Sequence, residues 1–214
     1  VTLELDRINL SMCATGESSH PYKSSLKLAT LSEGQEVSHG SGNYFKLGDK
    51  RFIVTAAHVV LSEGDVVVSD GYEYVATRLL YLDTDKDIAI IKPERELVDI
   101  KPARWKVSDD PDMIGRYVNY VGYPSELGKV LINGMISGGD SNSILMQSFA
   151  LPGSSGSVVF DSKGRVVGVV SAVMLHATPF SPNPQLVETM VYVGKLDFID
   201  REFLKEIFNV SWDL

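Results

Sequence analysis

A serine, a histidine and an aspartate of this sequence have the side chains and local surroundings that nucleophilic catalysis by serine needs. Ser155 lies in the segment GSSG at 153–156, between an apolar stretch and a run of valines. His58 ends the apolar segment VTAAH, and Asp87 opens the apolar segment DIAII, where an unpaired carboxylate would be costly to bury. Serine catalysis needs a hydroxyl, a base, a carboxylate that orients the base, and amide donors for the oxyanion. The sequence offers one candidate for each role.

The glycine two places before Ser155 predicts the oxyanion site. It lets the backbone turn so that the amides of Gly153 and Ser155 point at one spot. Ser154 is the rival nucleophile, but it has no glycine two positions before it. Each of these features alone is more often structural, whereas their joint occurrence in the order His, Asp, Ser is one of the known arrangements of this triad.

The elements that must position these residues are short strands. Segments rich in Val, Ile, Tyr and Thr recur with Gly, Asp, Asn or Pro between them, which is typical of an all-β sandwich or barrel. The stretch 96–115 has no clear period and reads as a connector between two β lobes. Ile199, Phe203 and Ile207 recur every four residues and predict a C-terminal helix, capped by Asp197 or Asp200. We predict strands in the following segments: SLKLATL, NYFKL, RFIVTA, DVVVSD, YVATRLLYL, IAIIKP, RYVNYVGY, KVLINGMIS, SILMQSF, SVVFD, RVVGVVSAVML and ETMVYVG.

Composition excludes several classes of function. The formal net charge of the 214 residues is −8 and the lysines and arginines are scattered, so no nucleic-acid partner is expected. No stretch approaches the roughly 20 apolar residues of a membrane helix. The four histidines form no close pair, so no metal is expected. The single cysteine, Cys13, permits no intrachain disulfide, and no leader peptide is visible. The sequence leaves the localisation unknown, and the single cysteine favours a soluble protein that is cytoplasmic or virus-encoded and intracellular.

Three blocks of the sequence resemble the signature blocks of chymotrypsin-like serine proteases. They are GSGNYFKLGDKRFIVTAAHVV at 40–60, DTDKDIAIIKP at 83–93 and LPGSSGSVVFDSKGRVVGVVSA at 151–172. The sequence is most similar to the disulfide-free bacterial and viral branch, which includes the HtrA-type enzymes. The resemblance implies an all-β fold of two six-stranded antiparallel β-barrels with a C-terminal α-helix. Within a single protease domain at 1–214, we expect lobes at about 25–95 and 115–196 and the helix at 197–208.

The resemblance also assigns the site. It makes His58 the general base, Asp87 its partner, Ser155 the nucleophile, and the amides of Gly153 and Ser155 the oxyanion hole. Asp83 and Asp85 are excluded because the family places the catalytic carboxylate immediately before the apolar pair.

The substrate-binding residues follow from the same resemblance. Ser171, Ala172 and Val173 match the strand that pairs with substrate, and Phe149 matches the floor of the specificity pocket. A valine in place of glycine narrows this pocket, and no acidic residue is available to bind a lysine or arginine. We therefore expect a small or apolar residue before the cleaved bond.

Two functions from different classes fit these observations. The first is a serine endopeptidase that acts on protein or peptide segments and needs neither a metal nor an organic cofactor. The second is a catalytically silent protease fold that binds a peptide in its groove as an added strand. Replacement of Ser155 by alanine distinguishes the two, because only an enzyme would lose its function.

Overall fold

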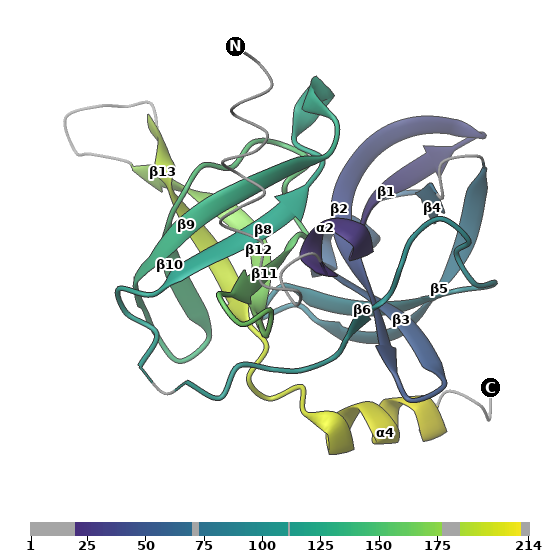
Figure 1. The fold of residues 1–214 in the computed structure, drawn as a ribbon. Coiled ribbons are helices and arrows are strands. Elements are labelled where there is room, and N and C mark those ends of the chain that lie inside the picture. Colours follow the sequence, from purple (N-terminus) through teal and green to yellow (C-terminus); the bar gives the residue numbers. More distant parts are fainter. Residues whose placement is uncertain (1–19, 70–72, 111, 177–184, 211–214) are drawn as a thin grey trace, which may run out of the picture.

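The computed structural model describes residues 20–69, 73–110, 112–176 and 185–210 of the chain. Figure 1 shows two groups of strands side by side, with the C-terminal helix below them. Within the described residues, none of the helices is long and apolar enough to span a membrane. The elements in chain order are α2 (His20–Ser24), β1 (Ser25–Ser32), β2 (Gln35–Leu47), β3 (Lys50–Thr55), α3 (Ala57–Val60), β4 (Asp65–Ser69), β5 (Tyr74–Asp83), β6 (Ile88–Pro93), β7 (Ala103–Arg104), β8 (Tyr117–Gly122), the 3-10 turn η1 (Ser125–Leu127), β9 (Val130–Gly139), β10 (Ser143–Gln147), β11 (Val158–Asp161), β12 (Val166–His176), β13 (Gln185–Lys195) and α4 (Arg201–Val210).

The strands form two antiparallel barrels. In the first, the order is β1-β4-β5-β6-β3-β2, and pairing of β1 with β2 closes the ring. The short strand β7 adds to β2 in parallel. In the second, β10-β13-β12-β11-β8-β9 form a closed barrel. The expected fold class, two six-stranded β-barrels with a C-terminal helix, is therefore confirmed.

One strand is longer than its sequence suggests. We expected a strand to begin at Asn43, but β2 begins at Gln35 and pairs with β1 along its whole first half. Residues 35–42 include polar side chains and two glycines, so they show no alternation typical of a strand. The turn at Glu33 and Gly34, both with positive φ, starts this hairpin and sets its register.

The C-terminal helix begins four residues later than expected. Asp200 is its cap, since its Oδ1 accepts a hydrogen bond from the Phe203 amide at 2.8 Å. The residues just before it make a turn that brings the Ile199 carbonyl to the indole Nε1 of Trp105, at 3.1 Å. Phe208, on the same helix, packs edge-on against Phe52 of β3, with ring centroids 5.6 Å apart. The helix thus packs against the hydrophobic core of the first barrel.

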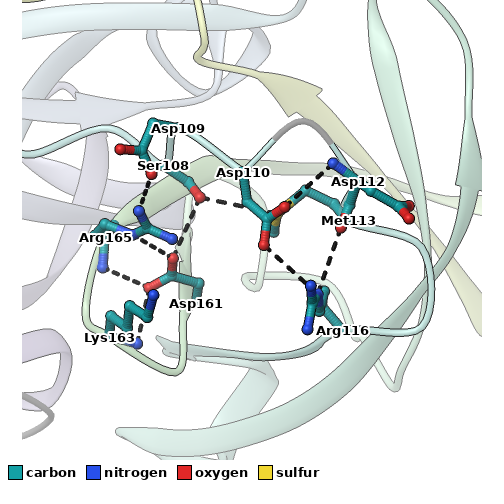
Figure 2. Close-up of polar contacts among 9 residues, drawn as sticks. All are labelled: Ser108, Asp109, Asp110, Asp112, Met113, Arg116, Asp161, Lys163 and Arg165. Carbon is teal, nitrogen blue, oxygen red and sulfur yellow. Dashed lines mark hydrogen bonds and ion pairs between the residues drawn. The ribbon is translucent and has the colours of Figure 1, made fainter.

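The connector between the barrels is pinned to the second barrel by a buried cation (Figure 2). Arg165 keeps 10% of its side-chain surface exposed, and its Nε lies 2.7 Å from Oδ2 of the buried Asp161. The same guanidinium also binds Asp109, near the end of the connector. Further along, Asp110 lies 3.5 Å from Arg116. The buried carboxylate of Asp161 needs a charged partner, which Arg165 supplies. Because the same guanidinium also contacts Asp109, it couples the position of the connector to the second barrel.

Candidate active site

His58 stands on a single helical turn directly after β3. The short helix α3 is held by the buried side chains of Ala57 and Val59, while the side chain of His58 keeps 51% of its surface exposed. Its backbone amide donates to Oδ1 of Asp87 at 2.9 Å, and its ring Nδ1 lies 2.7 Å from Oδ2 of the same carboxylate. This double contact fixes both the backbone and the ring of the histidine. With Nδ1 occupied as a donor, Nε2 is left as the atom that can accept a proton.

Asp87 lies in the turn between β5 and β6 and has a φ of 56°, a left-handed conformation that costs energy for a residue other than glycine. Burial by itself would raise the pKa of this carboxyl. The hydrogen bonds from the His58 ring, the Ser171 hydroxyl and the His58 amide outweigh burial, so the pKa lies below its usual value. Asp83 instead accepts a hydrogen bond from the Lys86 amide in the same turn. Of the nearby aspartates, Asp87 is thus the one that contacts the histidine.

Ser155 lies in the loop between β10 and β11. Its hydroxyl donates to the carbonyl oxygen of Ser171 at 3.2 Å, and no hydrogen bond joins it to His58 among the described residues. Such a bond between nucleophile and base is often long in a protein without substrate and tightens when substrate binds. The rival Ser154 is only 1% exposed, and its hydroxyl accepts from the Leu151 amide at 3.2 Å. Ser154 is therefore turned into the loop and away from solvent.

The loop around Ser155 leaves two amides free. Among the described residues, neither Gly153 nor Ser155 donates its backbone N–H to a protein acceptor. Gly153 has a φ of 92°, and a Cβ there would meet the Tyr123 carbonyl oxygen and lie 2.6 Å from Nε2 of His39. Only glycine fits this position without strain. The two amides are the groups expected to form an oxyanion hole.

Two serines that the sequence did not identify, Ser41 and Ser125, hold this loop in place. The Ser41 hydroxyl donates to the Gly153 carbonyl oxygen at 2.6 Å and accepts from the Tyr123 amide at 2.9 Å. The Ser125 amide donates to the Pro152 carbonyl oxygen at 2.7 Å. Since the C=O and N–H of a trans peptide point in opposite directions, this bond also fixes the direction of the Gly153 N–H. Neither brace has a local sequence signal, because the partners are far apart along the chain.

Ser171 joins the two barrels at the site. Its hydroxyl on β12 donates to Oδ2 of Asp87, and its carbonyl accepts from Ser155. Sequence reasoning placed Ser171 in the substrate-pairing strand and missed this contact with the carboxylate. The backbone of Ala172 and Val173 continues β12, but their side chains lie outside the described residues.

Phe149 lies just before the loop and keeps 43% of its surface exposed. Its carbonyl oxygen accepts a hydrogen bond from the hydroxyl of Tyr120. Burial raises the pKa of Tyr120 to about 12, so this tyrosine remains a hydrogen-bond donor at all ordinary pH values. Across the part of the chain that the structure describes, no group of three His, Cys, Asp or Glu side chains could hold a metal ion.

The closed barrels, with His58 and Asp87 on the first and Ser155 and Ser171 on the second, define a chymotrypsin-like serine protease fold. The model of the trypsin-like peptidase domain matches residues 40–169, and the chain belongs to this family.

Curated proteins that are similar to this chain are named as serine proteases. A probable periplasmic serine endoprotease, DegP-like, of Brucella suis biovar 1 (strain 1330) is 29% identical over 184 residues, which cover 75% of this chain and 34% of the relative. The serine protease HtrA-like of Staphylococcus aureus (strain USA300) is 28% identical over 190 residues, 75% of this chain and 24% of the relative. The chain thus spans about a third or less of the length of these relatives.

Solved structures show the same fold. The serine endoprotease from Yersinia pestis superposes with a TM-score of 0.69 at 18% identity, covering 90% of this chain and 65% of that one. The HtrA-type protease AlgW, solved with a tripeptide, gives a TM-score of 0.69 at 20% identity, covering 91% of this chain and 63% of that one.

Proposed function

We propose that this chain is a serine endopeptidase that hydrolyses peptide bonds through Ser155, His58 and Asp87. The observation that carries the proposal is the position of Ser171. Its carbonyl oxygen contacts the Ser155 hydroxyl at 3.2 Å, and its own hydroxyl contacts the Asp87 carboxylate that holds His58. The nucleophile and the carboxylate that holds the base thus both contact Ser171, which supports the proposal that Ser155, His58 and Asp87 act together in acyl transfer.

In the first half of the reaction, Ser155 Oγ attacks the carbonyl carbon of the scissile peptide and its proton passes to Nε2 of His58. The negative charge that develops on the carbonyl oxygen is stabilised by the amides of Gly153 and Ser155. The carboxylate of Asp87 keeps Nδ1–H in place and stabilises the imidazolium. His58 then gives its proton to the leaving nitrogen, the C–N bond breaks, and an ester to Ser155 remains.

In the second half, water replaces the departed amine. His58 takes a proton from the water, whose oxygen attacks the ester carbon, and the same two amides hold the oxyanion. Collapse of this intermediate breaks the ester bond, and the proton returns to Ser155 Oγ. Both halves use residues from both barrels, so we infer that the lobes at about 25–95 and 115–196 act as one protease unit.

The substrate preference expected from the sequence remains a proposal. Phe149 offers a partly exposed aromatic surface just before the loop. A substrate peptide that pairs with the backbone of Ser171, Ala172 and Val173 would place the side chain before its cleaved bond against this surface. We propose a small or apolar residue before the cleaved bond. A library of peptides that differ at this residue tests the proposal, which predicts cleavage after alanine or valine and none after lysine, arginine or aspartate.

Intact-mass analysis with a fluorophosphonate probe tests the catalytic proposal directly. The parent protein is expected to gain one adduct, and Ser155→Ala none, because only an activated serine reacts. Ser162→Ala is the matched control, since Ser162 is exposed in the turn after β11, and it should label as the parent does. An adduct that persists in Ser155→Ala would contradict the assignment. A parent that takes no adduct would favour the catalytically silent peptide-binding alternative.

A further inference from the structure

A groove of about 670 Å³ lies where the β2–β3 hairpin, the segment after β7 and the start of α4 meet. Among the described residues, it is lined by five of the chain's 20 lysines and arginines but by only one of its 28 acidic residues. None of the residues proposed to do the chemistry lines it. We call it the basic groove, and its cationic residues are Lys46, Arg51, Arg104, Lys106 and Arg201.

Strand register gathers three of these cations into a row. Lys46 of β2 lies directly opposite Arg51 of β3 on one side and Arg104 of β7 on the other. Residues that face each other on neighbouring strands share one face of the sheet, and like charges in that position destabilise it. The row therefore places three positive charges side by side at a cost to folding.

The other two cations extend the row toward the helix. Trp105 is buried, so Lys106 and Arg104 on either side of it project together to the opposite face of this extended segment. Arg201 opens α4, whose amino end carries partial positive charge. The only acidic lining residue, Asp200, already accepts the Phe203 amide as helix cap.

These cations have few internal partners. Within the described residues, Arg51 lies 3.8 Å from Glu96, and no carboxylate comes within 4.0 Å of Lys46, Arg104, Lys106 or Arg201. A cluster of like charges is stabilised by a ligand of opposite sign. The basic groove thus presents to an anionic ligand four cations that form no ion pair within the described residues.

We propose that the basic groove is a binding site for an acidic segment of an extended polypeptide. In such a segment, carboxylates two residues apart lie roughly 7 Å from each other, which matches the spacing of Arg104 and Lys106 along their own extended backbone. Outside the groove the chain carries an excess of acidic residues, since its net charge is −8 although the groove holds five cations. This excess would repel the long phosphate backbone of a nucleic acid, whereas a short acidic segment fits within the groove. The site goes beyond the proposed hydrolysis and does not depend on it.

The test measures binding of a fluorescein-labelled peptide of alternating glutamate and serine by fluorescence anisotropy. All proteins carry Ser155→Ala, so that the result is independent of hydrolysis and of the fluorophosphonate experiment. At an ionic strength of about 20 mM, where screening is weak, the glutamate peptide should bind and its glutamine counterpart should not. The double variant Arg104→Glu, Lys106→Glu should bind the glutamate peptide at least about tenfold more weakly.

A second double variant controls for net charge. Lys23 and Lys163 are exposed and lie outside the groove, so Lys23→Glu, Lys163→Glu makes the same change in charge and should alter affinity by less than about threefold. If the first double variant does not fold, Lys106→Gln alone should weaken binding by about threefold. Equal losses in both double variants, or equal binding of the two peptides, would overturn the proposal. A single-stranded oligonucleotide that binds more tightly than the peptide, in a manner dependent on Arg104 and Lys106, would replace it with a nucleic-acid site.

Discussion

The carboxylate of Asp87 contacts His58 twice, through the ring Nδ1 at 2.7 Å and through the backbone amide at 2.9 Å. The two residues are 29 positions apart, and each follows or precedes a buried strand of the first barrel. Because both oxygens of the carboxylate are engaged, the imidazole cannot turn without breaking a contact to Asp87. The histidine is thereby held in the tautomer that a general base needs.

Asp87→Asn should keep the fold and lose most of the activity. The amide can still contact His58, but it would favour the tautomer with the proton on Nε2, which cannot accept a proton from Ser155. We expect kcat to fall by about 10⁴-fold with a much smaller change in KM. Steady-state hydrolysis of a peptide substrate measures both constants. A decrease of less than tenfold would show that Asp87 does not orient the base.

Asp87 should also make stability depend on pH. Its pKa is lower in the folded protein than in the unfolded chain, so the unfolded chain binds the proton more tightly. The ionised carboxylate therefore stabilises the fold fully above the unfolded pKa of about 3.9, and this contribution is lost as the pH falls through the lower, folded value. Urea unfolding of the parent and of Asp87→Asn at pH 7, 4 and 3 should show a difference that shrinks with acidity. A constant difference would contradict the lowered pKa.

Gly153→Ala should disable the oxyanion loop. A Cβ would crowd the Tyr123 carbonyl and His39, and the φ of 92° is strained for alanine, so we expect a loss of about 1 to 3 kcal/mol in the free energy of unfolding. The loop would also shift its two amides, and kcat should fall by at least about a hundredfold.

Gly34→Ala is the matched control for Gly153→Ala. Gly34 has a φ of 78°, but a Cβ there would meet nothing within 4 Å. It should lose only about 1 kcal/mol and keep its kcat. Chemical denaturation measures the free energy of unfolding of both variants, and peptide hydrolysis measures their kcat. Equal kcat values in the two variants would refute the role of Gly153 in the oxyanion hole.

Lys129→Met should change how stability responds to alkaline pH. The Lys129 ammonium donates to the Ser25 carbonyl at 2.8 Å and lies 4.8 Å from the ring centroid of Tyr22, and burial lowers its pKa to about 8. Between pH 8 and about 10.4 the folded protein has released this proton while the unfolded chain still holds it, so stability rises with pH in this window.

The measurement is urea unfolding of the parent and of Lys129→Met at pH 7.5 and 10. The parent should gain stability relative to the variant at the higher pH. If the difference between the two proteins stays constant, the Lys129 amine titrates at its ordinary value in the folded state.

Local sequence predicted most of the strands, the all-β class of the fold and the identity of the chemical groups, but not the two-residue strand β7, which lies inside the expected connector. Alternating and continuous apolar segments predict strands because side-chain direction repeats every two residues, and the glycines around Ser155 predict a tight corner because only glycine adopts its backbone angles freely. The resemblance of three blocks to a known family then predicted that the strands form two closed barrels. The start of β2 and the exact start of α4 escaped this reasoning, since hairpin register and a buried tryptophan decide them.

Tertiary structure alone decided which groups meet. Ser171 and Asp87 are 84 positions apart, and Ser41 and Gly153 are 112 apart, so no local period connects them. Their contacts depend on the register of closed barrels and on how the two barrels pack. The same holds for the row of Arg51, Lys46 and Arg104, which look scattered along the chain but lie on three adjacent strands. Sequence specifies the side chains and their local direction, whereas strand pairing between distant segments sets their distances.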